Sequence, residues 1–156
     1  MATETNKRIQ HYIEKDFEYR GFRCVIVAHI MGHRCGYVGL PESNLYYGVS
    51  YHEIPVNAHG GLTYGQHPPN KGYYPVETGY PVYWIGFDCA HLYDLPDEDI
   101  LRKFGELNDE PERYDNIIRG GGYQGYGSSV RSQYYVETEL KCIVDQLLDV
   151  EQEEIN

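Results

Sequence analysis

The sequence predicts an α+β fold in which a mainly antiparallel sheet of four to five strands and two helices form a two-layer sandwich. Two observations predict this class. Segments rich in β-branched and aromatic residues, divided by glycine and proline turns, fill the chain up to about residue 90. Apolar residues at helical spacing follow only after them. The 156 residues suit one domain with a single core.

Three regions are expected along the chain. Residues 1–16 are polar and predict a short helix or an extended arm, residues 17–150 form the single domain, and residues 151–156 form an acidic tail. The N-terminus lacks the apolar stretch of a secretory signal, and the chain has no run of about 18 apolar residues that would predict a membrane span. We therefore expect a cytoplasmic protein whose four cysteines are free thiols.

The first strands are expected to form hairpins. Residues 17–30 predict a hairpin that turns at residues 20–21 and continues into a buried strand, because residues 25–27 are all β-branched. A glycine-containing turn at residues 31–36 leads into a return strand at residues 37–41, which ends in proline.

Two further strands follow. One is expected to start near Gly61, and a proline-rich surface loop at 66–81 separates it from a strand at 82–88. Alternation along this last strand gives it one apolar, core-facing side and places Trp84 and Asp88 on the opposite, ligand-accessible face. The core-facing side chains are Tyr83, Ile85, Phe87 and Cys89.

Helical signals occupy the rest of the chain. A first helix is expected from Pro96 or Asp97, with acidic residues in its first turn. Residues 119–129 contain five glycines and predict a loop that a compact domain does not need. The final helix is expected at 132–151, where apolar residues repeat at three and four positions.

Composition restricts the kind of ligand. The net charge of −11 and only 13 scattered basic residues exclude long nucleic acid, although backbone N–H groups and one or two arginines can still hold a small anion. The acidic surface can also meet a basic protein partner. The 17 tyrosines suit a contact surface, a planar ligand or a tyrosine-rich sheet face. We expect a homo-oligomer, with twofold pairing the commonest arrangement.

The first candidate site is the stretch His59-Gly60-Gly61. Two adjacent glycines let the backbone bend and bring N–H groups close to a bound group, and a histidine adds one switchable donor or acceptor. Thr63 follows two residues later and points the same way on a strand. The stretch predicts an anion contact or, alternatively, an ordinary turn at the start of a strand.

A second candidate site lies where a strand leaves the sheet, at Asp88-Cys89-Ala90-His91. Asp88 and His91 are expected to form a hydrogen-bonded pair that shapes a pocket without breaking a bond. Three alternatives remain open. The pair can act as a general base, His59 and Asp94 can join it to bind a divalent metal, or Cys89 can act as a nucleophile beside a histidine.

The glycine-rich loop supplies the remaining candidates. Arg119 and Arg131 flank it, and a guanidinium can clamp a phosphate or carboxylate through two parallel hydrogen bonds. Tyr123 and Tyr126 lie within it and are expected to stack on a base or sugar. Alternatively, the arginines only offset local acidic residues.

Several stretches together resemble a family of small, mostly uncharacterised proteins encoded by phages and prophages. They are "YRGFRCVIVAHIMGHRCGYVGLP", "YG" at 47–48, "HGGLTY" at 59–64, "WIGFDCAHLYD" at 84–94 and "YVETELKCIVDQL" at 135–147. The resemblance spans residues 19–148. The sequence departs from the family around residues 44–48 and in two loops, at 66–81 and 119–129, that are longer and richer in glycine, tyrosine and proline.

The resemblance implies a phage origin, and by analogy with other small phage proteins it implies a role against host immunity. We expect a protein that binds and sequesters a small phosphorylated nucleotide-derived signal in the host cytoplasm, with no catalytic residue, cofactor or metal. Two other classes stay open: a hydrolase or phosphodiesterase with histidine and aspartate, with or without metal, and an acidic inhibitor that binds a host protein. The expected ligand-binding residues are His59, Gly60, Gly61, Thr63, Trp84, Asp88, His91, Arg119, Tyr123, Tyr126 and Arg131.

Overall fold

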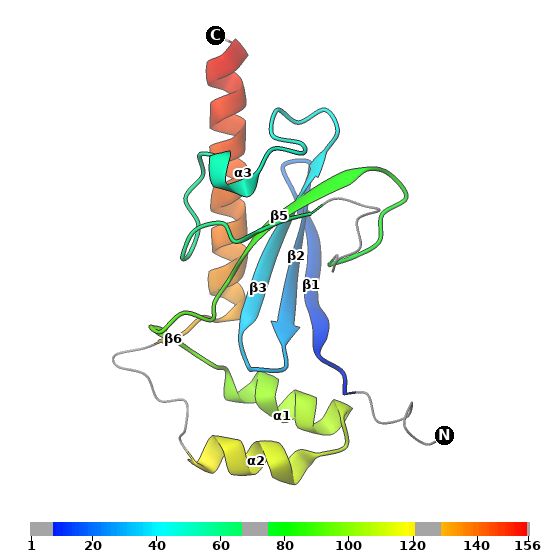
Figure 1. Ribbon diagram of the computed structural model, residues 1–156, viewed down its shortest axis with the longest axis vertical. Coiled ribbons are helices and arrows are strands. Elements are labelled where there is room, and N and C mark those ends of the chain that lie inside the picture. The colour runs from blue at the N-terminus through cyan, green and yellow to red at the C-terminus, as the bar shows by residue number, and fades with distance from the viewer. Residues whose placement is uncertain (1–7, 67–74, 121–128, 156) are drawn as a thin grey trace.

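The computed structural model describes residues 8–66, 75–120 and 129–155 and shows an α+β fold built on one five-stranded antiparallel sheet. The strand order is β1-β2-β3-β5-β4, and helix α3 packs against one face (Figure 1). The strands are β1 (His11–Tyr19), β2 (Phe22–His29), β3 (Arg34–Pro41), β4 (Tyr64–Gln66) and β5 (Val82–Asp88). The predicted fold class is thereby confirmed.

The described residues contain three α-helices where the sequence predicted two. They are α1 (Glu98–Leu107), α2 (Pro111–Gly120) and α3 (Gln133–Ile155), and a short 3₁₀ turn, η2, spans Tyr51–Glu53. Two short strands, β6 (Asp94–Leu95) and β7 (Ser129–Val130), pair in parallel apart from the main sheet. Helix α2 was not predicted, because Tyr114 is its one buried residue and the helix therefore shows only a weak pattern of apolar residues.

The predicted hairpin turn at Arg20 and Gly21 joins β1 to β2. Both residues have positive φ, 49° and 87°, as a two-residue turn of the kind that matches the twist of the paired strands requires. The pairing runs from Tyr19 opposite Phe22 to His11 opposite His29, with a bulge after Ile13. The arm expected at residues 1–16 is therefore wrong from His11 onward, where the chain is an edge strand.

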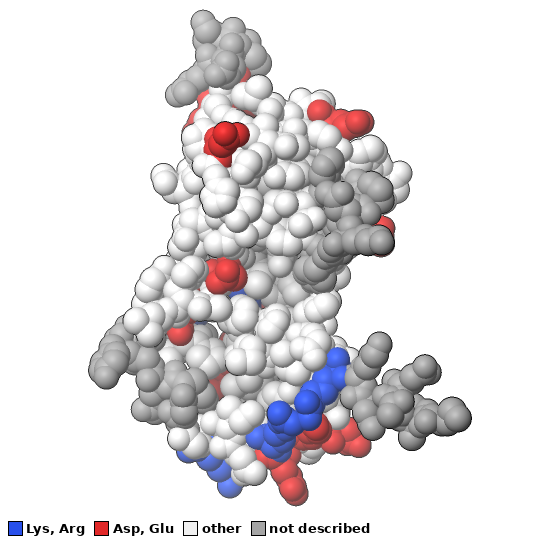
Figure 2. Space-filling model, in the orientation of Figure 1, with Lys and Arg blue, Asp and Glu red and all other residues white. Residues whose placement is uncertain are grey.

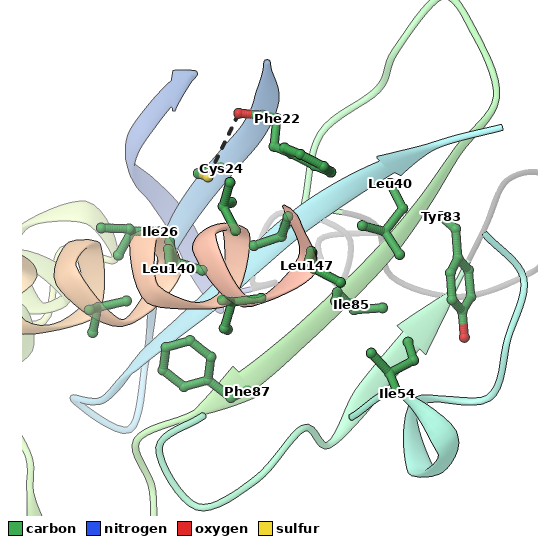
Figure 3. Close-up of a cluster of buried hydrophobic side chains, with 14 of the residues drawn as sticks. Phe22, Cys24, Ile26, Leu40, Ile54, Tyr83, Ile85, Phe87, Leu140 and Leu147 are labelled. Carbon is green, nitrogen blue, oxygen red and sulfur yellow. Dashed lines mark hydrogen bonds between the residues drawn. The ribbon is translucent and has the colours of Figure 1, made fainter. Parts of the chain in front are cut away.

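The main core lies between the sheet and α3. Leu140 and Leu147 project from the helix toward Ile26 and Ile85 of the sheet (Figure 3). The helix approaches β3 closely at Gly36, where a Cβ atom would lie 2.9 Å from the Phe87 ring and 3.0 Å from Leu140. The helix side of this core consists of Val136, Leu140, Ile143, Val144 and Leu147.

The opposite face of the sheet carries a second buried cluster, so the predicted alternation of β5 is confirmed but its consequence for the ligand is wrong. Trp84, expected to stack on a ligand, is fully buried. Its ring lies over Gly39 of β3, 3.1 Å from where a Cβ atom would stand. It packs with Val25, Val27, Tyr37 and Val82.

Helices α1 and α2 close one end of the sheet (Figure 1). Helix α1 begins where predicted, since the Asp97 carboxylate accepts a hydrogen bond from the Asp99 backbone N–H as an N-cap. Its buried side chains, with Tyr114 of α2, cover Ala28 at the end of β2. The buried side chains of α1 itself are Ile100, Leu101 and Phe104.

The C-terminal helix is longer than expected. It continues to Ile155, through most of the segment predicted as an acidic tail. Among the described residues, no helix combines the length and the apolar character needed to cross a membrane.

Replacing Leu140 by alanine should lower the free energy of unfolding by about 2–5 kcal/mol, because the side chain is fully buried between α3 and the sheet. Urea unfolding followed by circular dichroism measures this loss. Tyr134→Ala serves as the control on the same helix, since that side chain is exposed and its loss should change stability by less than about 0.5 kcal/mol. Equal losses for the two variants would contradict the packing described.

Candidate functional site

The candidate site is organised around one buried carboxylate, Asp94 in β6. Its side chain is 1% exposed and accepts hydrogen bonds from three segments of the chain. His59 Nε2 lies 2.9 Å from both carboxylate oxygens, His91 donates from its backbone N–H and from Nδ1, each at 3.0 Å, and Arg131 Nε lies at 2.8 Å. We call Asp94, His59, His91, Arg131 and Tyr135 the Asp94 hub.

Local structure brings these distant residues together. After β5 the chain turns tightly, and the Asp94 N–H donates a hydrogen bond to the His91 carbonyl oxygen at 2.9 Å. This turn brings the His91 imidazole into contact with the Asp94 carboxylate. The pairing of β6 with β7 places Arg131 one residue beyond the end of β7. Tyr135 stands in the first turn of α3, whose start is capped by the Ser132 hydroxyl.

The hub keeps Asp94 ionised. Burial alone would raise the pKa of this carboxyl group, but hydrogen bonds from Arg131, His59 and His91 outweigh burial and lower the pKa to about 2. The same contact raises the pKa of Arg131. The buried anion is therefore matched by a fixed cation and by polar hydrogens.

An ionised Asp94 also fixes how the two imidazoles are protonated. A carboxylate only accepts hydrogen bonds, so the facing atoms, Nε2 of His59 and Nδ1 of His91, must carry protons. His59 Nδ1 then accepts from the Tyr135 hydroxyl at 2.7 Å. In a neutral His91 the remaining nitrogen, Nε2, is left as an acceptor.

The glycine bend meets this group as the sequence suggested. Gly60 and Gly61 both have positive φ, at 68° and 85°. A Cβ atom on Gly60 would lie 2.2 Å from the His91 ring, so the imidazole rests directly on the Gly60 backbone. His59 itself is buried and faces inward toward Asp94.

The predicted pairing of Asp88 with His91 is wrong. Asp88 instead accepts a hydrogen bond from the Thr63 hydroxyl at 3.3 Å and from the Ala90 N–H at 3.1 Å. The turn that follows β5 carries His91 round to Asp94, three residues later. Thr63 and Asp88 therefore form a separate pair at the end of β5.

Of the two arginines predicted to contact the ligand, one lies in the hub and the other does not. Arg131 belongs to the hub, whereas Arg119 lies in the last turn of α2 and forms no hydrogen bond or ion pair with the hub residues within the described part of the chain. Tyr123 and Tyr126 lie outside the described residues.

Three residues of the site were not predicted from the sequence: Arg34, Tyr93 and Tyr135. Arg34 is buried and bonds Glu14, Asp97 and the carbonyl oxygen of Arg131, so it ties β1, β3 and α1 to the base of the hub. Tyr135 and Tyr93 appeared as two tyrosines among 17. Only the spacing of Tyr135 at the start of the last helix could have singled it out.

The outward side of the hub is cationic and aromatic. The side chains of Arg131 and His91 are 24% and 26% exposed. The His91 ring stacks on the Tyr93 ring with 5.3 Å between centroids and 5° between planes. The Arg131 guanidinium lies 5.0 Å from the Tyr135 ring centroid and 5.9 Å from that of Tyr93, within cation–π range.

The hub also contains a possible metal-ligand set. One ligand atom each from His59, His91 and Asp94 lies within 4.8 Å of the others, and the Tyr135 contact to His59 resembles an outer-shell support. However, a guanidinium bonds the same carboxylate, and its positive charge opposes a second cation there. These residues therefore fit a hydrogen-bonded anion better than a metal centre.

Cys89 does not suit the alternative role of a nucleophile beside a histidine. Cys89 is buried, and burial raises the pKa of its thiol far above the usual range. A neutral buried thiol is a poor nucleophile, because the thiolate is the reactive form. Cys89 instead packs in the main core beside α3.

Comparison with known proteins adds no identity: no protein-family model, curated protein or solved structure matches this chain. The capability of the site follows from its own chemistry. An anchored guanidinium and a stacked, partly exposed tyrosine are groups that can contact a flat or anionic small molecule.

Gly60→Ala should destabilise the protein more than Gly61→Ala does. Both substitutions place a side chain at positive φ, but only the one at Gly60 drives a methyl group into the His91 ring. Nothing lies within 4 Å of a Cβ atom on Gly61, so this variant isolates the backbone cost. We expect a difference of about 1–3 kcal/mol in the free energy of unfolding. Indistinguishable urea midpoints would show that His91 does not rest on Gly60.

Stability should fall on acidification because of His33, in the turn between β2 and β3. Burial and the neighbouring His29 ring, 4.7 Å away, lower the pKa of His33 to about 4, although Asp88 and Asp94 oppose the shift. The unfolded chain therefore binds more protons than the native state below pH 6.5, and stability is lost as the pH falls from about 6.5 to 4.

His33→Gln should remove part of this loss, since glutamine does not titrate. Unfolding free energies at several pH values between 7.5 and 4 measure the slope. His52→Gln is the matched control, because His52 is exposed and its replacement should leave the slope unchanged. A slope that stays the same in His33→Gln would refute the assignment.

Proposed function

We propose that this protein binds a small phosphorylated, nucleotide-derived ligand on the outward side of the Asp94 hub and does not transform it. One observation carries the proposal. Arg131 is anchored to Asp94 through Nε, while no hydrogen bond to its terminal guanidinium nitrogens is found among the described residues. A guanidinium held in this way presents its outer edge to a phosphate.

Neighbouring groups support an anion with a planar ring. The bend at Gly60, which has positive φ, lies against the His91 ring beside this surface, and the Gly61 N–H bonds the Ala58 carbonyl oxygen at 2.8 Å. The exposed Tyr93 ring, 45% accessible and already stacked on His91, offers a face on which a base can stack. The His91 side chain, 26% exposed, stands beside Tyr93 at the rim of the same surface.

The charge distribution favours a small ligand. With a net charge of −11, the chain repels long nucleic acid, and the attraction must come from a few local groups. Arg131 is such a group, since its partner Asp94 is buried and the exposed part of the pair is the cation. A small molecule with one or two phosphates suits this limited positive surface.

The hub is arranged for holding rather than for turnover. Asp94 bonds several donors at once, so it has no lone pair to spare as a base, and its pKa of about 2 makes it a weak proton acceptor. The alternative of a hydrolase would have to use His91 Nε2 as the general base. Turnover of a nucleotide substrate separates the two functions directly.

The resemblance to phage-encoded proteins suggests why such binding would be useful. A small protein in the host cytoplasm that holds a nucleotide-derived immune signal would lower the free concentration of that signal without any chemistry. Assembly into a homo-oligomer would multiply the binding sites.

Isothermal titration with cyclic dinucleotides and cyclic ADP-ribose isomers tests the function. We expect one of them to bind, to raise the melting temperature, and to be released intact on denaturation. Arg131→Lys keeps the ion pair with Asp94 but loses the guanidinium edge, so it should weaken binding at least tenfold. Arg102→Lys, on α1 and exposed, is the matched control and should bind as the wild type does.

Three results would reject the proposal. Recovery of a hydrolysed product would assign the hub to catalysis. Unchanged affinity in Arg131→Lys would remove the anchored guanidinium from the site. No binding of any tested nucleotide, combined with salt-resistant capture of a defined host protein, would favour the acidic inhibitor instead.

A further inference from the structure

A cavity beside the first half of α1 has a composition unlike that of the Asp94 hub. It has a volume of about 290 Å³ and lies between the chain before β1, the turn after β2 and the two helices α1 and α2. Leu101 and Tyr114 line it and are themselves buried. Ile30, Met31, Pro96 and Ile117 complete the apolar wall.

The cavity carries two guanidinium groups as well. Arg8 bonds Glu110 through Nε and Nη2 at 2.9 and 3.0 Å, and Arg113 Nη1 lies 3.9 Å from the same carboxylate. Arg8 is therefore closely paired with Glu110, whereas the same carboxylate engages Arg113 only loosely. Figure 2 shows Lys and Arg side chains at this end of the molecule, over α1 and α2, with Asp and Glu side chains among them.

Apolar side chains stand open to solvent around the cavity. Met31 is 68% exposed, and Ile117 on α2 is also exposed. Exposed apolar side chains that gather at a hollow are typical of a surface that another molecule covers. A molecule that is apolar along its length and anionic at one end would match the apolar wall and the loosely paired Arg113.

We propose that this cavity binds a medium-chain alkyl carboxylate of about eight to ten carbons. The volume lies at the lower limit for small-molecule sites, which excludes larger amphiphiles from complete burial. The alkyl chain lies against Met31, Leu101 and Ile117, and the carboxylate pairs with Arg113, the less engaged of the two guanidiniums. A guanidinium binds a carboxylate through two parallel hydrogen bonds.

Titration of the full chain with hexanoate, octanoate and decanoate tests the proposal by calorimetry. The affinity should rise about fourfold for each added methylene until the cavity is full. Octanol, with the same chain and no charge, and acetate, with the charge and no chain, should both bind at least tenfold more weakly than octanoate. Equal binding of octanol and octanoate would overturn the role of the arginines.

Two variants locate the site. Arg113→Gln should weaken octanoate binding at least tenfold and leave octanol unchanged, whereas Arg102→Gln, on the neighbouring helix but outside the cavity, should change neither. Met31→Ser should weaken octanoate and octanol alike, and circular dichroism checks that this exposed substitution leaves the fold intact. No saturable binding of any of the three carboxylates, or binding only of a peptide with a free C-terminal carboxylate, would overturn the proposal.

Discussion

The arrangement of the site depends on one constraint: a carboxylate buried to 1% exposure must have its lone pairs satisfied. Asp94 meets this requirement with donors from the turn before β4, the turn after β5 and the residue after β7. Removing any one donor leaves a buried anion short of a partner, which costs far more than an exposed contact would. Hydrogen bonds to this one carboxylate therefore fix the positions of the three segments relative to one another.

A second buried ion, Arg34, connects the Asp94 hub to the main sheet and to α1. It bonds Glu14 on β1 and Asp97 at the start of α1, and its Nη1 also bonds the carbonyl oxygen of Arg131 at 3.0 Å. The Arg131 backbone is thus fixed by one buried cation while its side chain is fixed by one buried anion. Helix α1 and the hub consequently share a support, because the carboxylate that caps α1 also pairs with Arg34.

Local signals in the sequence were enough for most strands of the main sheet, but not for the first half of β1, for the short strands β6 and β7, or for the hub. The turn at Arg20 and Gly21, the alternation in β5 and the cap at Asp97 each depend on neighbouring residues, so pattern alone predicts them. Asp94 depends on partners 35 and 37 positions away, and no local rule distinguishes it from Asp88. The prediction that Trp84 faces a ligand was wrong for a related reason, because distant parts of the chain decide which side chains cover a sheet face.

The buried pair also explains why a partly exposed arginine can be a good recognition group. A free arginine side chain loses rotamer entropy on binding, about 1–2 kcal/mol, and this loss weakens the complex. Arg131 is already held by Asp94 and by the rings of Tyr93 and Tyr135, so most of that loss occurs on folding. The ion pair that stabilises the buried carboxylate therefore also fixes the direction of the Arg131 side chain. The exposed edge of its guanidinium can contact an anion without further loss of rotamer entropy.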